Sequence, residues 1–106
     1  MSREEFDLGD GNYLEILMRD NIAEDQRVTS YGRMIWYQEN PLNTRKIVMF
    51  RLIESTVVIE TVAVRDGKLS VIAGDEESFR GTSFPLESFT YPEIFMTLDS
   101  LGAFYG

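Results

Sequence analysis

The chain has 106 residues, 43% of them apolar and 12% aromatic, and this size and composition predict a single globular domain over residues 1–106. Eighteen acidic residues against ten basic ones give a net charge of −8, which would repel nucleic-acid phosphate, so no direct nucleic-acid binding is expected. Cysteine and histidine are absent, which removes disulfides, thiolate nucleophiles, the usual zinc ligands and the commonest general base. We therefore predict no catalytic residue, no metal and no cofactor.

The N-terminal segment MSREEFDLGD lacks the apolar stretch of a signal peptide, and no later run reaches the roughly 18 apolar residues of a membrane helix. We expect a soluble, cytoplasmic protein with no membrane partner. The sequence patterns of serine nucleophiles, phosphate-binding loops and dinucleotide folds are also missing, so an enzyme is not expected. Eighteen carboxylates leave a minor enzyme with carboxylate chemistry as an alternative.

Short apolar and aromatic runs separated by turn residues predict an antiparallel meander of about five to seven strands. The clearest hairpin signal is Asp66-Gly67 between two β-branched runs, which predicts that 57–64 pairs with 68–73. The polar segment 22–29 and the segment 39–44 (ENPLNT) are predicted to be a loop and a turn. The predicted strands are 13–18, 31–38, 46–53, 56–64 and 69–73.

The C-terminal segment carries the clearest helix signal. Residues 90–93 (TYPE) match a capping box with proline in the first turn, and one apolar stripe follows. Apolar residues on both faces of 47–53 and 57–64 indicate central strands, covered on one side by a helix or rolled into a small barrel. The stripe consists of Ile94, Leu98, Leu101 and Tyr105, widened by Phe95, and Phe79, Phe84 and Phe89 are expected to close one end of the sheet.

The predicted fold class is therefore α+β: a curved antiparallel meander or small barrel with an amphipathic C-terminal helix packed on it. In the order of its elements, and in no sequence motif, this architecture is similar to the pleckstrin-homology-like fold and to small α+β proteins that plug toxins or phage-defence targets. Element order of this kind implies no ligand.

The stretch FDLGDGN places two aspartates around two glycines and raises the question of a calcium loop. An EF-hand loop needs oxygen ligands at its first, third and fifth positions, before an invariant glycine. Counting back from Gly11 places Asp10, Leu8 and Phe6 at those positions, so two of the three ligands are missing. We predict instead a tight turn over 9–12 that joins Phe6 and Leu8 to the strand 13–18.

Three groups of residues are candidates for binding a partner. The first hairpin is the most acidic part of the chain, and a second acidic run, 75–77, would hold Mg²⁺ or Ca²⁺ only if the fold supplied a third oxygen ligand. The third group mixes aromatic side chains with a base, a composition found in stacking platforms for single-stranded nucleic acid, in protein hot spots and in ordinary sheet packing. The candidates are Glu4, Glu5, Asp7, Asp10 and Glu15; Asp75, Glu76 and Glu77; and Arg33, Trp36 and Tyr37.

These features favour a small acidic, non-catalytic protein-interaction module that binds a basic surface of another protein. Inhibitors, immunity or antitoxin proteins and phage anti-defence proteins are of this kind, and mimicry of nucleic acid by surface carboxylates is a special case. The alternative is a pocket protein that holds a small apolar or anionic ligand against Trp36 and a basic stripe. A homodimer through outer strands also stays open. If the predicted strands 31–38 and 46–53 are neighbours, the basic stripe would consist of Arg33, Arg45, Lys46 and Arg51.

Overall fold

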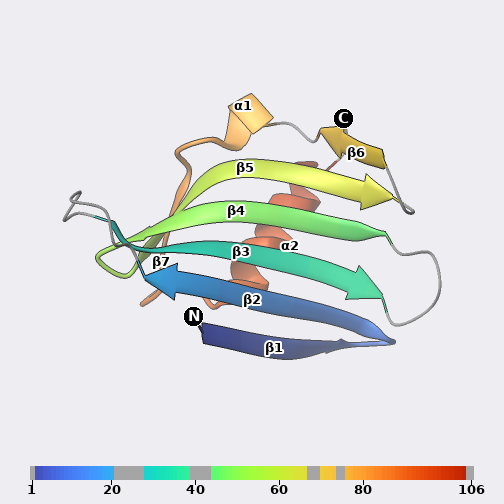
Figure 1. The fold of residues 1–106 in the computed structure, drawn as a ribbon, viewed down its shortest axis with the longest axis horizontal. Coiled ribbons are helices and arrows are strands. Elements are labelled where there is room, and N and C mark those ends of the chain that lie inside the picture. Colours follow the sequence, from blue (N-terminus) through green and yellow to red (C-terminus); the bar gives the residue numbers. More distant parts are fainter. Residues whose placement is uncertain (1, 21–27, 39–43, 67–69, 74–75, 105–106) are drawn as a thin grey trace.

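The computed structural model describes residues 2–20, 28–38, 44–66, 70–73 and 76–104, and the backbone alone of 66, 70–73, 76 and 77. In these residues, seven strands and two helices follow one another, arranged as in Figure 1. They are β1 (Ser2–Gly9), β2 (Asn12–Asp20), β3 (Val28–Gln38), β4 (Arg45–Ile53), β5 (Thr56–Asp66), β6 (Ser70–Ala73), α1 (Glu76–Phe79), β7 (Ser83–Pro85) and α2 (Tyr91–Ser100).

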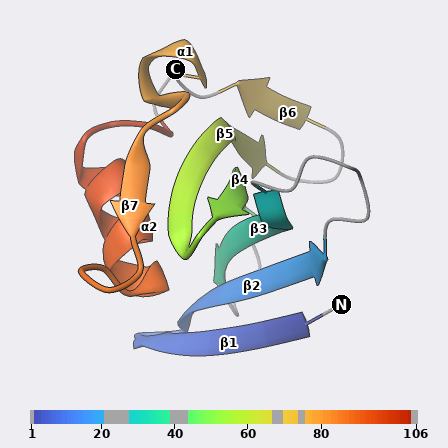
Figure 2. The same ribbon diagram turned by 90° about the vertical axis from the view of Figure 1, so that its left-hand side faces the viewer.

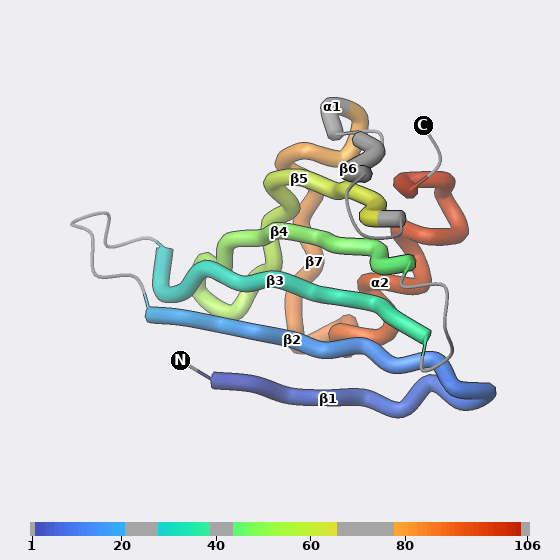
Figure 3. The backbone as a smooth tube through the Cα atoms, turned by 45° about the vertical axis from the view of Figure 1, so that its right-hand side comes forward, coloured from blue at the N-terminus to red at the C-terminus, as the bar shows by residue number. Residues whose placement is uncertain are grey.

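The strands β1 to β6 pair antiparallel in chain order, and β7 pairs separately with β5. The sheet curls into a half-barrel, and α2 packs on it (Figures 1 and 2). Figure 3 shows β1 at one edge of this sheet, followed in order by β2, β3, β4 and β5. The predicted α+β meander with a C-terminal helix is therefore confirmed.

The tight turn over 9–12 is confirmed as a two-residue hairpin between β1 and β2. Asp10 and Gly11 both have positive φ, 54° and 78°, which is the pattern of a type I′ turn. Asn12 donates its side-chain amide to the Gly9 carbonyl at 3.0 Å, and Asp7 accepts from the Gly9 N–H at 2.8 Å. Both side chains thus serve the turn itself.

The pairing predicted from Asp66-Gly67 is confirmed for the last part of β5: Ala63 to Asp66 lie opposite Ala73 to Ser70, while Gly67 lies outside the described residues. One boundary was predicted wrongly, because β3 begins at Val28, inside the segment expected to be a loop. Val28 is buried opposite Ile53 of β4, so pairing extends the strand into a polar stretch. Residues 21–27 and 39–43 lie outside the described part of the chain.

Helix α2 begins as predicted. Thr90 is the N-cap, and its hydroxyl accepts from the Glu93 N–H while the Glu93 carboxylate accepts from the Thr90 N–H. The predicted stripe is correct at Ile94, Phe95 and Leu98, which are buried. It is wrong at Leu101, which is 64% exposed because the helix ends at Ser100 and Leu101 is its C-cap. Tyr105 lies outside the described residues.

The core lies between α2 and one face of the sheet, here called the inner face. Trp36 stacks on Phe95 with ring centroids 6.4 Å apart, and the Lys46 ammonium lies 2.9 Å from the Asp99 carboxylate of α2 and 4.8 Å from the Trp36 ring centroid. Phe84 and Phe89 form an edge-to-face pair and, with Phe79, pack against this core. The opposite face of the sheet is left for other contacts.

Candidate functional site

The face of the sheet opposite α2, here called the outer face, follows from the pleat and the register. Because successive side chains of a strand point to opposite faces, the neighbours of Trp36 and Lys46 point away from α2. The register places them in four rows that cross the strands. These rows are Arg19, Tyr31, Arg51 and Val58; Arg3, Leu17, Arg33, Met49 and Thr61; Glu5, Glu15, Ile35, Ile47 and Ala63; and Asp7, Tyr13, Tyr37, Arg45 and Arg65.

The charge of the outer face differs in sign from that of the whole chain. Three carboxylates lie in its rows, Glu5, Asp7 and Glu15, and Glu60 is added at the β-bulge where β5 slips against β4. Six arginines outnumber these four carboxylates, although the chain as a whole carries a net charge of −8. The outer face is thus a basic surface on an acidic protein.

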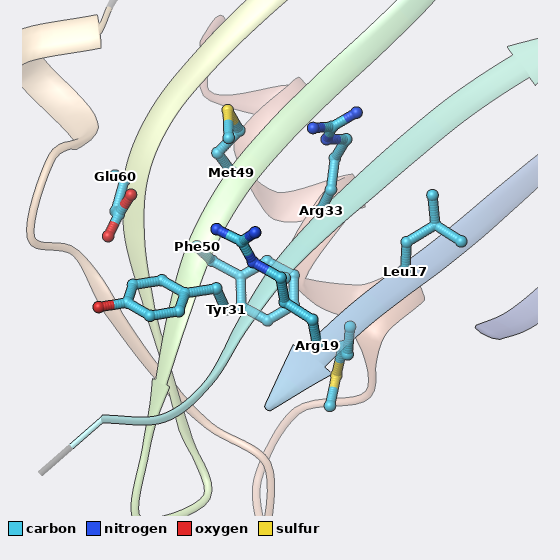
Figure 4. Close-up of a pocket in the computed structure, with 9 residues that line it drawn as sticks. Leu17, Arg19, Tyr31, Arg33, Met49, Phe50 and Glu60 are labelled. Atoms are coloured by element: carbon cyan, nitrogen blue, oxygen red, sulfur yellow. The ribbon is translucent and has the colours of Figure 1, made fainter. Parts of the chain in front are cut away.

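A pocket of about 460 Å³, here called the trough, lies on this face between the first two rows. The side chains of Arg19 and Tyr31 form one wall, and those of Leu17, Arg33 and Met49 form the other (Figure 4). The residues of the intervening row point to the inner face and form the floor, and Glu60 closes the end at β5. The floor consists of Met18, Gly32 and Phe50.

The cations around the trough differ in their partners. The Arg19 guanidinium lies over the Tyr31 ring, 5.8 Å from its centroid. Arg51 Nε lies 3.1 Å from a Glu60 carboxylate oxygen, a distance of an ion pair but without hydrogen-bond alignment. Arg33 is exposed and makes no ion pair with any residue that the structure describes. Arg19 and Arg33 therefore offer positive charge to the trough, while Arg51 neutralises Glu60.

The acidic residues of the first hairpin do not form one surface. Glu5 and Glu15 lie on the outer face, where Arg3 contacts both carboxylates at 3.2 and 2.6 Å. Glu4 points to the inner face, where its charge contributes to a raised pKa of the Tyr91 hydroxyl after the larger effect of burial. Asp7 and Asp10 belong to the turn.

The aromatic and basic candidates are divided between the two faces. Arg33 and Tyr37 share the outer face, where Tyr37 stacks on Tyr13 with centroids 5.5 Å apart and lies beneath the Arg45 guanidinium. Trp36 lies on the inner face with Phe95. The predicted basic stripe is correct for Arg33, Arg45 and Arg51 but not for Lys46, which pairs with Asp99 on the inner face.

The second acidic run, residues 75–77, lies before and at the start of α1. Asp75 lies outside the described residues, and Glu76 and Glu77 are described only as backbone of α1. Among the residues described, no three histidine, cysteine, aspartate or glutamate side chains are placed to hold a metal ion. In the same residues, neither helix has the length and apolar character needed to cross a membrane.

Comparisons with known proteins add nothing to this geometry. No family model, curated protein or solved structure matches the chain.

We predict an alkaline shift in the titration of Tyr37. Its hydroxyl donates to Glu5 at 2.7 Å, and this hydrogen bond, followed by burial and the charges of Glu5 and Glu15, raises the pKa of Tyr37 to about 12 from the ordinary 10.0. Ultraviolet difference titration against Tyr37→Phe measures that pKa, and Glu5→Gln is expected to bring it back toward 10.0. The matched control is Glu4→Gln, which changes the opposite face.

The same shift has a consequence for stability. Between pH 10.0 and about 12 the unfolded chain loses the Tyr37 proton while the folded chain keeps it, so the free energy of unfolding falls as the pH rises through that window. Denaturant titrations at several alkaline pH values are expected to show a steeper fall for the wild type than for Tyr37→Phe. Equal slopes would contradict the assignment of the hydrogen bond.

Proposed function

We propose that the chain is a small, non-catalytic protein-interaction module that binds another protein through the outer face of its sheet. The observation that carries the proposal is the composition of this face, which no other described element covers. Arginine, tyrosine and methionine, the side chains enriched in protein interfaces, stand together in its rows. Met49 in the middle of the sheet is 41% exposed.

The charge pattern supports a partner whose contact surface is acidic rather than basic. The basic partner expected from the sequence rested on the net charge of −8 and on the acidic first hairpin as a binding face, and within that hairpin Glu4 and Glu5 point to opposite faces. Arg3 neutralises Glu5 and Glu15, and the charged side chains in the middle of the outer face are mainly arginines. Inhibitor, immunity and antitoxin roles all remain compatible with binding of this kind.

The alternative pocket protein receives less support. It required Trp36 to face the same ligand as Arg33 and Arg51, and the sheet lies between them. The space beside Trp36 is occupied by Phe95 and by the Lys46 ammonium. A ligand on the arginines would therefore meet the outer face without tryptophan.

The experiment that tests the proposal is affinity purification of the tagged chain from its native host, with mass spectrometry and cross-linking of the recovered complex. We expect one stoichiometric protein, cross-linked to β2, β3 and β4, whose association slows as the salt concentration rises. A chain that recovers no protein, or that retains only a small molecule, would contradict the proposal.

Two exposed methionines supply a matched pair of variants. Met49→Glu introduces a charge in the middle of the outer face, and Met96→Glu introduces the same charge on the solvent side of α2, where Met96 is 53% exposed. We expect Met49→Glu to weaken partner binding by about 10-fold or more, the effect of truncating a contact worth more than 1 kcal/mol. Met96→Glu is expected to bind as the wild type does; equal losses would place the interface elsewhere.

A further inference from the structure

We propose that the trough is the anchoring pocket of the outer face, and that it takes an acidic peptide segment in which a carboxylate adjoins an apolar side chain. This inference rests on the proposed function and names the chemistry of the partner. Its starting point is the arrangement of two cations and three apolar groups around one pocket of about 460 Å³ (Figure 4).

The carboxylate position follows from the two arginines. Arg19 and Arg33 lie on neighbouring strands in adjacent rows, on opposite walls of the trough. Residues in such diagonal positions have Cα atoms about 7–8 Å apart, within reach of long side chains. A guanidinium presents a planar set of donors that matches a carboxylate, so an anion between the two walls receives charge-assisted hydrogen bonds from both.

The apolar position follows from the remaining lining. Leu17 and Met49 lie on either side of Arg33 in the second row, and the Tyr31 ring stands on the opposite wall. Met49 is among the most exposed large apolar side chains of the described chain, so covering it removes apolar surface from water. A leucine or phenylalanine beside the carboxylate would cover this surface.

Glu60 stands at the end of the trough and would repel a second carboxylate there. Its charge is already matched by Arg51, 3.1 Å away, so it does not cancel the positive charge of Arg19 and Arg33. The β-bulge that carries Glu60 offsets it from the four rows. The two ends of the trough therefore differ. The anion is expected near β2 and β3, and the apolar group near β4.

The rest of the outer face argues for a protein as the source of this segment. Ile47, which is half-buried, continues the apolar surface beyond the trough, and a small acid would leave it uncovered. Nucleic acid is disfavoured because Glu5, Glu15 and Glu60 engage Arg3 and Arg51, which leaves fewer arginines to neutralise successive phosphates. The tyrosine faces that a base would need for stacking are already in contact with Tyr13, Arg19 or Arg45.

The test uses the full 106-residue chain as bait for a random dodecapeptide library displayed on phage. We expect enrichment of peptides with aspartate or glutamate next to leucine, methionine or an aromatic residue, and loss of that enrichment on Arg33→Glu. Enrichment of basic peptides, no enrichment, or the same peptides on wild type and Arg33→Glu would each overturn the inference.

The affinity of the enriched peptide for each variant, measured at 150 mM salt, then gives the contribution of each charge. Arg33→Glu is expected to weaken its binding about 10- to 100-fold, the loss of a charge-assisted hydrogen bond. Arg45→Glu makes the same change of charge in the row farthest from the trough and is expected to cost a few-fold at most. Met96→Glu, which adds a negative charge on the solvent side of α2, is the control expected to match the wild type.

The outcomes separate this inference from the proposed function. Equal losses for Arg33→Glu and Arg45→Glu would show that only the overall field matters, which overturns the anchoring pocket but leaves a protein-binding face intact. A labelled single-stranded oligonucleotide that displaces the peptide and binds more tightly at 150 mM salt would overturn both. Far-UV circular dichroism confirms that each variant is folded before its affinity is compared.

Discussion

Gly32→Ala is expected to be among the most destabilising single substitutions in the sheet. A Cβ at this position would lie within 2.6 Å of three ring atoms of Phe50, and Phe50 is 1% exposed. The ring has little room to move, because it lies in the core and contacts Tyr91 of α2 with centroids 6.0 Å apart. We expect a loss of about 3 kcal/mol or more in the free energy of unfolding, measured by urea titration, from a total of about 5–15 kcal/mol.

A double-mutant cycle separates the steric cause from any effect of glycine on the backbone. Phe50→Leu alone removes the ring and is expected to cost stability by leaving space in the core. In the double variant, Gly32→Ala with Phe50→Leu, the new methyl group meets a smaller neighbour. The double variant is therefore expected to lose less unfolding free energy than the sum of the losses in the two single variants. Strict additivity would contradict the explanation.

Phe95→Ala is expected to detach α2 from the sheet. Phe95 is 1% exposed and lies between Trp36 and Phe104, with ring centroids 6.4 and 5.3 Å away. Truncating a buried phenylalanine costs about 3–5 kcal/mol, a large part of the stability of a domain of this size. Trp36 is the only tryptophan of the chain, so its fluorescence is expected to report the change directly.

The neighbouring residue in α2 provides the control for this experiment. Met96→Ala changes a side chain that is 53% exposed and is expected to alter the unfolding free energy by less than about 0.5 kcal/mol. The fluorescence of Trp36 is expected to stay as in the wild type. Alanine is a better helix former than methionine, so a loss as large as that of Phe95→Ala would contradict the assignment of the stabilising contact to Phe95.

Much of the architecture could be predicted from the sequence because the signals were local. The alternation of apolar residues, the Asp-Gly pairs and the capping box at Thr90 are each read within a few residues, and each corresponds to an element of the structure. The helix was predicted one turn too long at Leu101, where the apolar pattern continues past the last helical residue, Ser100.

One local feature, the turn between β4 and β5, gave no signal in the sequence. The turn between β4 and β5 uses Glu54 and Ser55, both with positive φ, 48° and 68°, where glycine or asparagine would have been the usual indication. Its conformation is supported instead by Leu86, whose N–H donates to the Ser55 carbonyl. Such a contact between residues far apart in sequence cannot be read from the turn itself.

The candidate site depended on a property that the sequence leaves open, the face on which each side chain lies. The alternation of a strand predicts that Trp36 and Tyr37 lie on opposite faces, as they do, but the sequence leaves open which of the two faces α2 covers. Arg45 and Lys46 are divided in the same way, and only the register shows which of them joins Arg33. The trough combines residues from four strands, so no single motif announces it.

The contact between α2 and the inner face also has a consequence in time. Residues 91–100 are synthesised after all the long strands, and the stretch from the end of β5 at residue 66 to the end of α2 at residue 100 takes about 2–7 s at typical rates of translation. Until then the buried side of the sheet has no cover. The order of the elements therefore leaves the apolar inner face of the nascent sheet exposed for seconds before α2 can cover it, an interval in which exposed apolar surface favours aggregation.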